Sequence, residues 1–256
     1  MKHEGIFYNI LKSENINRNL LLLHGLTGNK ERWDGYIKEL NKSYNLILID
    51  LIGHGQSISP KELKQFSAEY QAKTILNILK KEKISNSAII CHSCSFNLAT
   101  KLIELDPLKF SRLIMISPFF EEGNSRINKK IKYLKFALKF WNLLPHLRKK
   151  GRFNYPKNGE EVSFWDYKKG IEEVGIKTYL ASLYSALNFD NKNKKFILPS
   201  LVVYKEDDNL FTSDMLKILK SRFQNLSEKR IKGKGHLFLI QDKKEILKVV
   251  RSFSRM

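Results

Sequence analysis

Short apolar runs recur along the first half of the chain, and most are followed by a segment with apolar residues at helical spacing. The runs lie at residues 5–11, 20–23, 45–50, 88–92 and 112–117, and the helical spacing lies at 30–42, 66–81 and 96–105. Runs of this length without polar alternation are typical of strands that are buried on both faces of a sheet. Strands that alternate with helices predict an α/β fold with a mostly parallel central sheet and helices on both of its faces.

The alternation stops near residue 121, and residues 121–196 show helical patterns without an intervening strand. Expected helices lie at 129–147, where basic and apolar residues mix, and at 161–188. The strand pattern returns at 198–204, followed by a helix from 212, a short strand at 229–232 and a closing helix at 243–253. The chain is therefore predicted to consist of an α/β core, residues 1–120 and 197–256, with an inserted helical cap at 121–196.

Composition narrows the class of protein. A chain of 256 residues that is 42% hydrophobic is long enough for a sizeable core. No apolar run approaches the ~18 residues of a membrane helix, and the first residues lack the apolar core of a signal peptide, so we expect a cytoplasmic protein. The net charge of +20 could attract nucleic acid. However, no run interleaves basic and aromatic residues, and no helix-turn-helix or zinc-ligand spacing is found, so a well-solvated basic surface is favoured and no nucleic-acid partner is expected.

The clearest candidate for chemistry is Ser93, which follows the apolar run at 88–92 and precedes a helical pattern. A strand, a sharp turn and a helix with a serine at the turn form the outline of a nucleophile elbow. This turn brings the residues two before and two after the nucleophile close to neighbouring chain, so both must be small. Cys91 and Ser95 occupy these positions and are small, which favours Ser93 as the nucleophile.

Two other registers of the same turn are less favourable. With Cys94 at the tip, the flanking residues would be His92 and Phe96, which are too large. With Ser95 at the tip, the flanking residues are tolerable, but the nucleophile would lie too far into the helix.

A serine nucleophile needs a base that removes its proton and an acid that orients the base. His236 lies in a glycine-rich turn near the C-terminus, and Asp207 and Asp208 follow the strand predicted at 198–204. The order Ser, Asp, His along the chain is that of one particular architecture. The residues alone leave both aspartates as candidates for the acid.

Five motifs in a fixed order carry a resemblance to a known family. They are His24-Gly25, Asp50-x-x-Gly53-x-Gly55-x-Ser57, His92-Ser93, Glu206-Asp207-Asp208 and Gly233-x-Gly235-His236. Each motif is weak alone, but together the chain resembles the α/β-hydrolase fold family over nearly its whole length. The family's glycines on either side of the nucleophile are replaced here by Cys91 and Ser95, and a frequent third glycine by Phe96.

The resemblance implies a role for each matching residue. Ser93 would be the nucleophile and His236 the general base, and the family's spacing selects Asp208 as the acid. The backbone N–H groups of Leu26 and Cys94 would form the oxyanion hole. The implied activity is a serine hydrolase that cleaves a carboxylic ester or related acyl compound through an acyl-enzyme, without metal or organic cofactor.

The expected cap suggests the nature of the substrate. Aromatic residues of the cap, together with one histidine of the core, are predicted to line the pocket: His24, Phe136, Phe140, Trp141 and Trp165. This lining favours a small-molecule acyl substrate with an apolar group. The basic and apolar helix at 129–147 also allows weak association with anionic membranes. The oligomeric state is not predicted.

Two alternatives come from other classes of protein. The fold also hosts ligand receptors and binding proteins with weak catalysis. In addition, Cys91 and Cys94 form a C-x-x-C pair at the start of a helix, as in redox proteins. The redox hypothesis is weaker, because Cys91 would point into packed structure.

Overall fold

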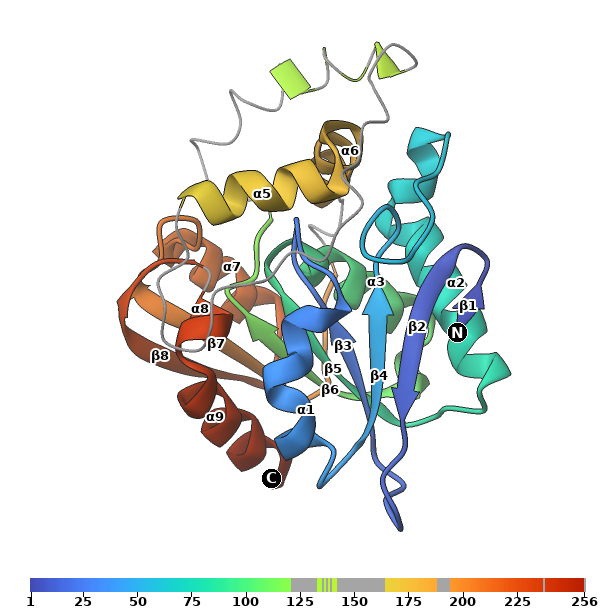
Figure 1. The fold of residues 1–256 in the computed structure, drawn as a ribbon. Helices are drawn as coiled ribbons and strands as arrows, with labels where there is room; N and C mark the ends of the chain where they lie inside the picture. Colours follow the sequence, from blue (N-terminus) through green and yellow to red (C-terminus); the bar gives the residue numbers. More distant parts are fainter. Residues whose placement is uncertain are drawn as a thin grey trace.

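An eight-stranded sheet forms the centre of the described chain (Figure 1). The computed structural model describes residues 1–120, 164–187, 194–236 and 238–255, together with Tyr133, Leu134, Phe136, Leu138, Phe140 and Trp141. The strands are β1 (Lys2–His3), β2 (Ile6–Leu11), β3 (Asn19–Leu23), β4 (Asn45–Asp50), β5 (Ser87–His92), β6 (Phe110–Ile116), β7 (Ser200–Asp207) and β8 (Leu226–Lys234). Their order in the sheet is β1-β2-β4-β3-β5-β6-β7-β8. The β1–β2 and β2–β4 pairs are antiparallel and the other five pairs are parallel, which confirms the predicted fold class.

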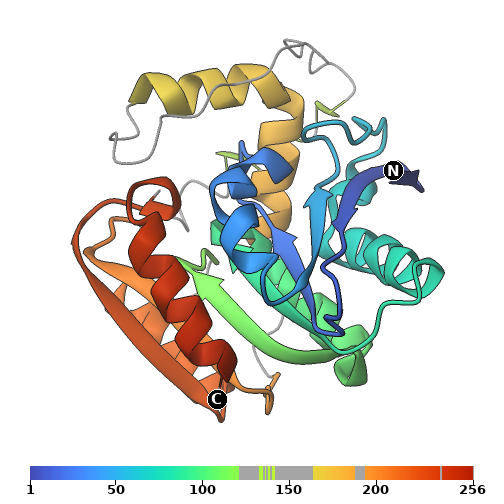
Figure 2. The same cartoon turned by 60° about the horizontal axis from the view of Figure 1, so that its bottom comes forward.

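Helices cover both faces of this sheet (Figures 1 and 2). They are α1 (Asp34–Leu40), α2 (Ala68–Lys81), α3 (Phe96–Leu105), α5 (Phe164–Val174), α6 (Ile176–Leu187), α7 (Ser213–Arg222), α8 (Phe238–Gln241) and α9 (Lys243–Arg255). Alternate residues of the central strands enter two separate apolar clusters. In β3, for example, Leu20 and Leu22 pack with α1 and α9, whereas Leu21 and Leu23 pack with α2, α3 and α7. Burial on both faces explains why these strands are continuous apolar runs.

Local hydrogen bonds set the boundaries of several elements, and the pattern of apolar residues in the sequence does not reveal these bonds. The helix predicted at 30–42 is a 3-10 turn, Lys30–Trp33, followed by α1, and the Asn29 side chain caps the turn. The helix predicted at 66–81 begins at Ala68, because the hydroxyl of Ser67 accepts the N–H of Tyr70. The strand predicted at 229–232 is part of the longer β8. Most of its residues are exposed at the edge of the sheet, so the strand has no continuous apolar run from which its length could be predicted.

Helices α5 and α6 lie over the edge of the sheet at which the parallel strands end (Figure 1). They fall within the region predicted as helical at 161–188. Gly175, which has a φ of 82°, separates the end of α5 from the start of α6. Most of the helix predicted at 129–147 lies outside the described residues, so its membrane association and the domain boundaries stay predictions. No described helix is long and apolar enough to cross a membrane.

Candidate active site

The turn after β5 has the backbone of a strained elbow. Ser93 has a φ of 54°, in the left-handed region that residues with a side chain avoid. The chain then enters a 3-10 turn, Ser93–Ser95, and continues directly into α3. Ser95 itself has a φ of −73° and a ψ of −2°, an ordinary right-handed conformation. A side chain at position 95 is therefore compatible with the turn.

The hydroxyl of Ser95 holds the elbow together. It accepts the backbone N–H of His92 at 3.0 Å and lies 3.1 Å from the carbonyl oxygen of Leu23 and 2.9 Å from that of His92. All of these groups are buried. A serine at position 95 thus supplies hydrogen bonds that a glycine could not.

A chain of hydrogen bonds joins three residues from distant parts of the sequence. Ser93 Oγ lies 2.7 Å from His236 Nε2, and His236 Nδ1 lies 3.0 and 3.1 Å from the two carboxylate oxygens of Asp208. With Nδ1–H donating to Asp208, Nε2 is free to accept the Ser93 hydroxyl proton. Each of the three side chains is at least nine-tenths buried. The structure brings together the three residues that the sequence motifs predict as a triad.

The Asp208 carboxylate is held from several sides. Its Oδ1 accepts the backbone N–H groups of Leu210 and Phe211 at 2.9 and 3.1 Å, and its Oδ2 accepts the Ser117 hydroxyl at 2.6 Å. Burial by itself would raise the pKa of Asp208. Hydrogen bonds from His236, Ser117 and Leu210, together with the histidine charge, outweigh burial and hold that pKa below its usual value.

Two neighbouring residues clarify how the acid is positioned. The side chain of Asp207 is exposed, and its backbone carbonyl accepts the N–H of Gly235, so Asp207 supports the histidine loop rather than the imidazole. Ser117 was not anticipated from sequence as a site residue. Its position directly after β6, at the same sheet edge as the elbow, is the only signal that could have indicated it.

His92 also contacts the catalytic loop. Its ring centroid lies 5.8 Å from that of His236, and the two rings are tilted by 31°. Burial, followed by the charge of His236, keeps the pKa of His92 well below its usual value, so this imidazole is neutral. We interpret His92 as a structural support for the loop that carries His236.

The predicted oxyanion-hole residues Leu26 and Cys94 line one small cavity, which Ser93, His236 and Asp208 do not line. Its volume is about 40 Å³, and its walls come from the loops after β3 and β4, from the start of α3 and from α6. Phe66, Leu98 and Ala186 give it apolar surface, whereas Ser182 and Ser185 add hydroxyl groups from α6.

The structure places three of the predicted pocket residues away from the lining of the small cavity. The side chains of Phe136 and Phe140 are 60% and 48% exposed and contact each other edge to face, so they do not line the enclosed cavity. Trp141 is buried behind its wall, where the ring meets Phe66 edge to face and Nε1–H donates to the carbonyl of Lys61. These differences arise because helical spacing does not reveal which face of the segment meets the core.

His24 has a structural role at the base of the site. Its Nε2 accepts the N–H of Leu51 at 3.0 Å, and its Nδ1 lies 2.8 Å from the carbonyl oxygen of Gly25. Burial is the main cause that keeps the pKa of His24 well below its usual value. The backbone of Trp165 belongs to α5, but its side chain lies outside the described residues.

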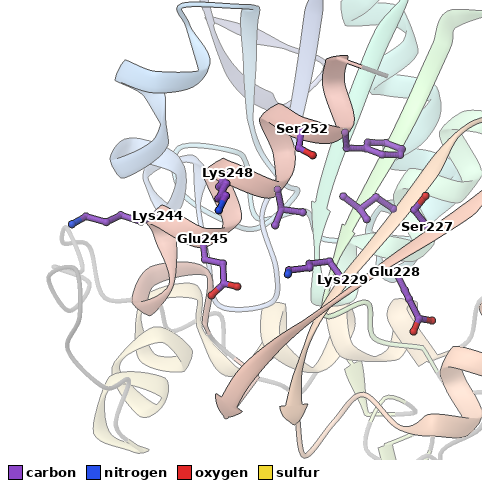
Figure 3. Close-up of a pocket in the computed structure, with 10 residues that line it drawn as sticks. Ser227, Glu228, Lys229, Lys244, Glu245, Lys248 and Ser252 are labelled. Atoms are coloured by element: carbon purple, nitrogen blue, oxygen red, sulfur yellow. The ribbon is translucent and has the colours of Figure 1, made fainter.

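A larger hollow lies away from these residues, between α9 and β8 (Figure 3). Its volume is about 530 Å³, and Lys229, Lys244 and Lys248 lie around it. Like the small cavity, it is lined by none of Ser93, His236 and Asp208, so neither hollow by itself marks the site. We therefore place the candidate site at the elbow, where the reactive groups meet.

The structure does not support a redox role for the C-x-x-C pair. Cys91 and Cys94 are both free thiols. Burial raises the pKa of Cys91, and it raises that of Cys94 to about 11. Redox cysteines depend on a lowered thiol pKa, which is the opposite shift.

Comparison with known proteins agrees with this geometry. The model of the alpha/beta hydrolase fold family matches residues 18–158, more than half of the chain. The chain belongs to the α/β-hydrolase fold family. The match covers the elbow and both predicted oxyanion-hole residues, whereas Asp208 and His236 lie beyond it.

Relatives of this α/β-hydrolase carry several activities in their names. A Bacillus subtilis protein named "Putative 2-succinyl-6-hydroxy-2,4-cyclohexadiene-1-carboxylate synthase" is 28% identical over 115 residues, which is 44% of this chain and 42% of that protein. A Haemophilus influenzae "Putative esterase/lipase" is 21% identical over 91% of this chain and 82% of its own. An epoxide hydrolase of Bacillus megaterium superposes with a TM-score of 0.75 at 14% identity, over 98% of this chain and 97% of its own. Two of these three proteins are named as hydrolytic enzymes, and the fold is shared over nearly the full length of this chain.

Proposed function

We propose that this α/β-hydrolase is a serine hydrolase that cleaves a small carboxylic ester or related acyl compound through an acyl-enzyme. The observation that carries the proposal is the buried hydrogen-bond chain from Ser93 through His236 to Asp208. It ends at Ser93, at the tip of the turn between β5 and α3. This arrangement has the geometry of nucleophile, base and orienting acid.

In the proposed mechanism, His236 Nε2 removes the hydroxyl proton while Ser93 Oγ attacks the carbonyl carbon. Asp208 holds the ring with Nδ1–H toward it and stabilises the imidazolium. The N–H groups of Leu26 and Cys94 then stabilise the oxyanion, an effect worth about 10²–10³ in rate for one donor. The imidazolium protonates the leaving alcohol. Water, activated by the same imidazole, hydrolyses the acyl-enzyme and restores Ser93.

The chemistry of the nucleophile separates ester from epoxide hydrolysis. A carboxylate that opens an epoxide gives an ester, which water can cleave. A serine hydroxyl that opened an epoxide would give an ether, which this set of residues could not hydrolyse. Because the residue at the elbow tip is Ser93, we favour an acyl substrate over the epoxides named for some relatives.

The small cavity adjoins the predicted oxyanion-hole residues Leu26 and Cys94. Its lining mixes apolar residues with the hydroxyl groups of Ser182 and Ser185. This lining is compatible with the substrate proposed from sequence, an acyl compound with an apolar group.

The test uses p-nitrophenyl acetate, butyrate and octanoate, with a fluorophosphonate as a probe of the nucleophile. We expect turnover of at least one of these esters and labelling of wild type, both lost in Ser93→Ala. Ser87→Ala serves as the control, because this buried serine of the same strand lies outside the site. Equal turnover by wild type and Ser93→Ala would refute the proposal. Ester binding without turnover or labelling would favour the alternative, a ligand receptor.

A further inference from the structure

Helix α5 packs directly on the loop that follows β3 and contains Leu26 (Figure 1). A Cβ atom at position 170 would lie 3.0 Å from Cβ of Thr27, 3.1 Å from its hydroxyl oxygen and 3.4 Å from its backbone carbonyl oxygen. Carbon atoms in ordinary contact are about 3.5–4.0 Å apart. Gly170 therefore allows the helix to lie closer to Thr27 than a residue with a side chain would.

A second contact joins the same helix to the same loop. Nδ2–H of Asn29 donates a long hydrogen bond, 3.5 Å, to Oε1 of Glu173, and both side chains are at least nine-tenths buried. Oδ1 of Asn29 accepts the backbone N–H of Glu31 and so caps the 3-10 turn before α1. Because Gly170 and Glu173 are three residues apart, they lie on one side of α5. The helix thus holds the loop at two points.

The loop has a backbone conformation that its own sequence does not favour. The N–H of Gly28 donates to the carbonyl of Gly25 at 3.1 Å, so one hydrogen bond closes a four-residue turn with Leu26 and Thr27 at its centre. Thr27, the second central residue, has a φ of 62°, which suits glycine and strains a β-branched residue. Contacts from outside the loop are therefore needed to keep its peptide groups, the Leu26 N–H among them, in place.

We propose that Gly170 and Glu173 are positioning residues for the oxyanion hole, because α5 holds the loop that carries the Leu26 N–H. This role rests on the proposed function, since the Leu26 N–H stabilises an oxyanion only in that reaction. A donor must lie about 2.7–3.1 Å from the oxyanion to be effective. A small shift of the loop thus weakens the hydrogen bond that matters in the transition state, and α5 contributes to the rate without touching the substrate.

The variant Gly170→Ala tests the first contact. The added methyl group pushes on Thr27, so kcat for p-nitrophenyl acetate and the rate of fluorophosphonate labelling should both fall about 3- to 30-fold, part of the effect of one complete donor. KM should stay within about twofold, because the oxyanion forms only in the transition state. If the contact were irrelevant, kcat would not change and Tm would rise, since alanine favours a helix more than glycine does.

Relief of the contact provides a rescue that a general change in stability would not. Thr27→Gly removes the two atoms that lie nearest to position 170, and glycine accepts the φ of 62°. In the Thr27→Gly background, Gly170→Ala should therefore change kcat by less than about twofold, so the two substitutions should be strongly non-additive. The same loss of kcat in both backgrounds would refute the role of this contact.

The variants Glu173→Gln and Glu173→Ala test the second contact. Glutamine keeps an oxygen that can accept from Asn29 and should retain most of kcat. Alanine leaves the buried amide without this partner and should lower kcat about 3- to 10-fold with little change in KM. Lys169→Ala is the control, because this exposed residue belongs to the same helix, and its kcat should match wild type.

The outcomes separate this inference from the proposed function. Wild-type kcat and labelling in Gly170→Ala, with hydrolysis still dependent on Ser93, would overturn the inference and leave the proposed function intact. A raised KM at unchanged kcat would also overturn it, because α5 would then shape only the binding of the substrate. Equal activity of wild type and Ser93→Ala would overturn both.

Discussion

Replacement of Ser95 by the glycine that is usual in the family should weaken this protein. In Ser95→Gly the backbone N–H of His92 loses its acceptor while it stays buried, and the carbonyl of Leu23 loses a donor. The φ of −73° at position 95 gives glycine no conformational advantage. The family's preference for glycine and the local geometry therefore predict opposite results.

The magnitude follows from the groups that are left without partners. A buried donor without an acceptor costs about 1–3 kcal/mol. The greater backbone freedom of glycine in the unfolded chain adds roughly 0.5–1 kcal/mol. At a central value of about 2.5 kcal/mol, a chain of this size should lose roughly 5–10 °C in Tm. Ser95→Ala should show the hydrogen-bond part of the loss alone.

Thermal and urea unfolding followed by circular dichroism would measure this loss. Ser87→Ala is the matched control, because Ser87 is a buried serine at the start of the same strand and its hydroxyl has no partner within the described chain. Its removal should leave stability unchanged or slightly raised. If Ser95→Gly proves as stable as wild type, the Ser95 hydroxyl does not support the elbow and the reasoning is wrong.

Three further results are expected. Asp208→Asn should lower kcat for p-nitrophenyl acetate by about 10³–10⁴, because the imidazole loses the carboxylate that orients it. Asp207→Asn should keep kcat within about twofold of wild type. A larger loss of kcat in Asp207→Asn than in Asp208→Asn would identify Asp207 as the acid. Ser117→Ala should lower kcat by about 5- to 50-fold, since it removes one hydrogen bond to a charged carboxylate, and an unchanged kcat would contradict that positioning role. His24 and His92 have a lower pKa in the folded than in the unfolded state, so the unfolded chain binds more protons below about pH 6.5. Urea unfolding should show stability falling by up to about 1.4 kcal/mol per pH unit for each histidine between pH 6.5 and 5, with a shallower fall in His24→Gln; equal stability at pH 7 and pH 5 would refute the assignment.

The sequence could not place the helical insertion on the core. Phe136, Phe140 and Trp141 have the same kind of side chain and fall at helical spacing, yet only Trp141 is buried among the three. Which side of a helix meets the core depends on the elements packed against it, and periodicity does not contain that information. Ser117 was missed for a similar reason, because only tertiary packing brings the end of β6 to Asp208.

The sequence by itself determined the α/β class, the buried strands and the identity of the turn serine, because these depend on local pattern and on the size of residues near the turn. The order of the motifs also predicted His236 as a partner. The residues alone left Asp207 and Asp208 open and only the resemblance favoured Asp208, whereas in the tertiary structure the Asp208 carboxylate meets the imidazole and the Asp207 side chain is exposed. The tertiary structure also placed the Ser117 hydroxyl on the Asp208 carboxylate. That contact joins loops after two different strands, and no local pattern contains the distance between them.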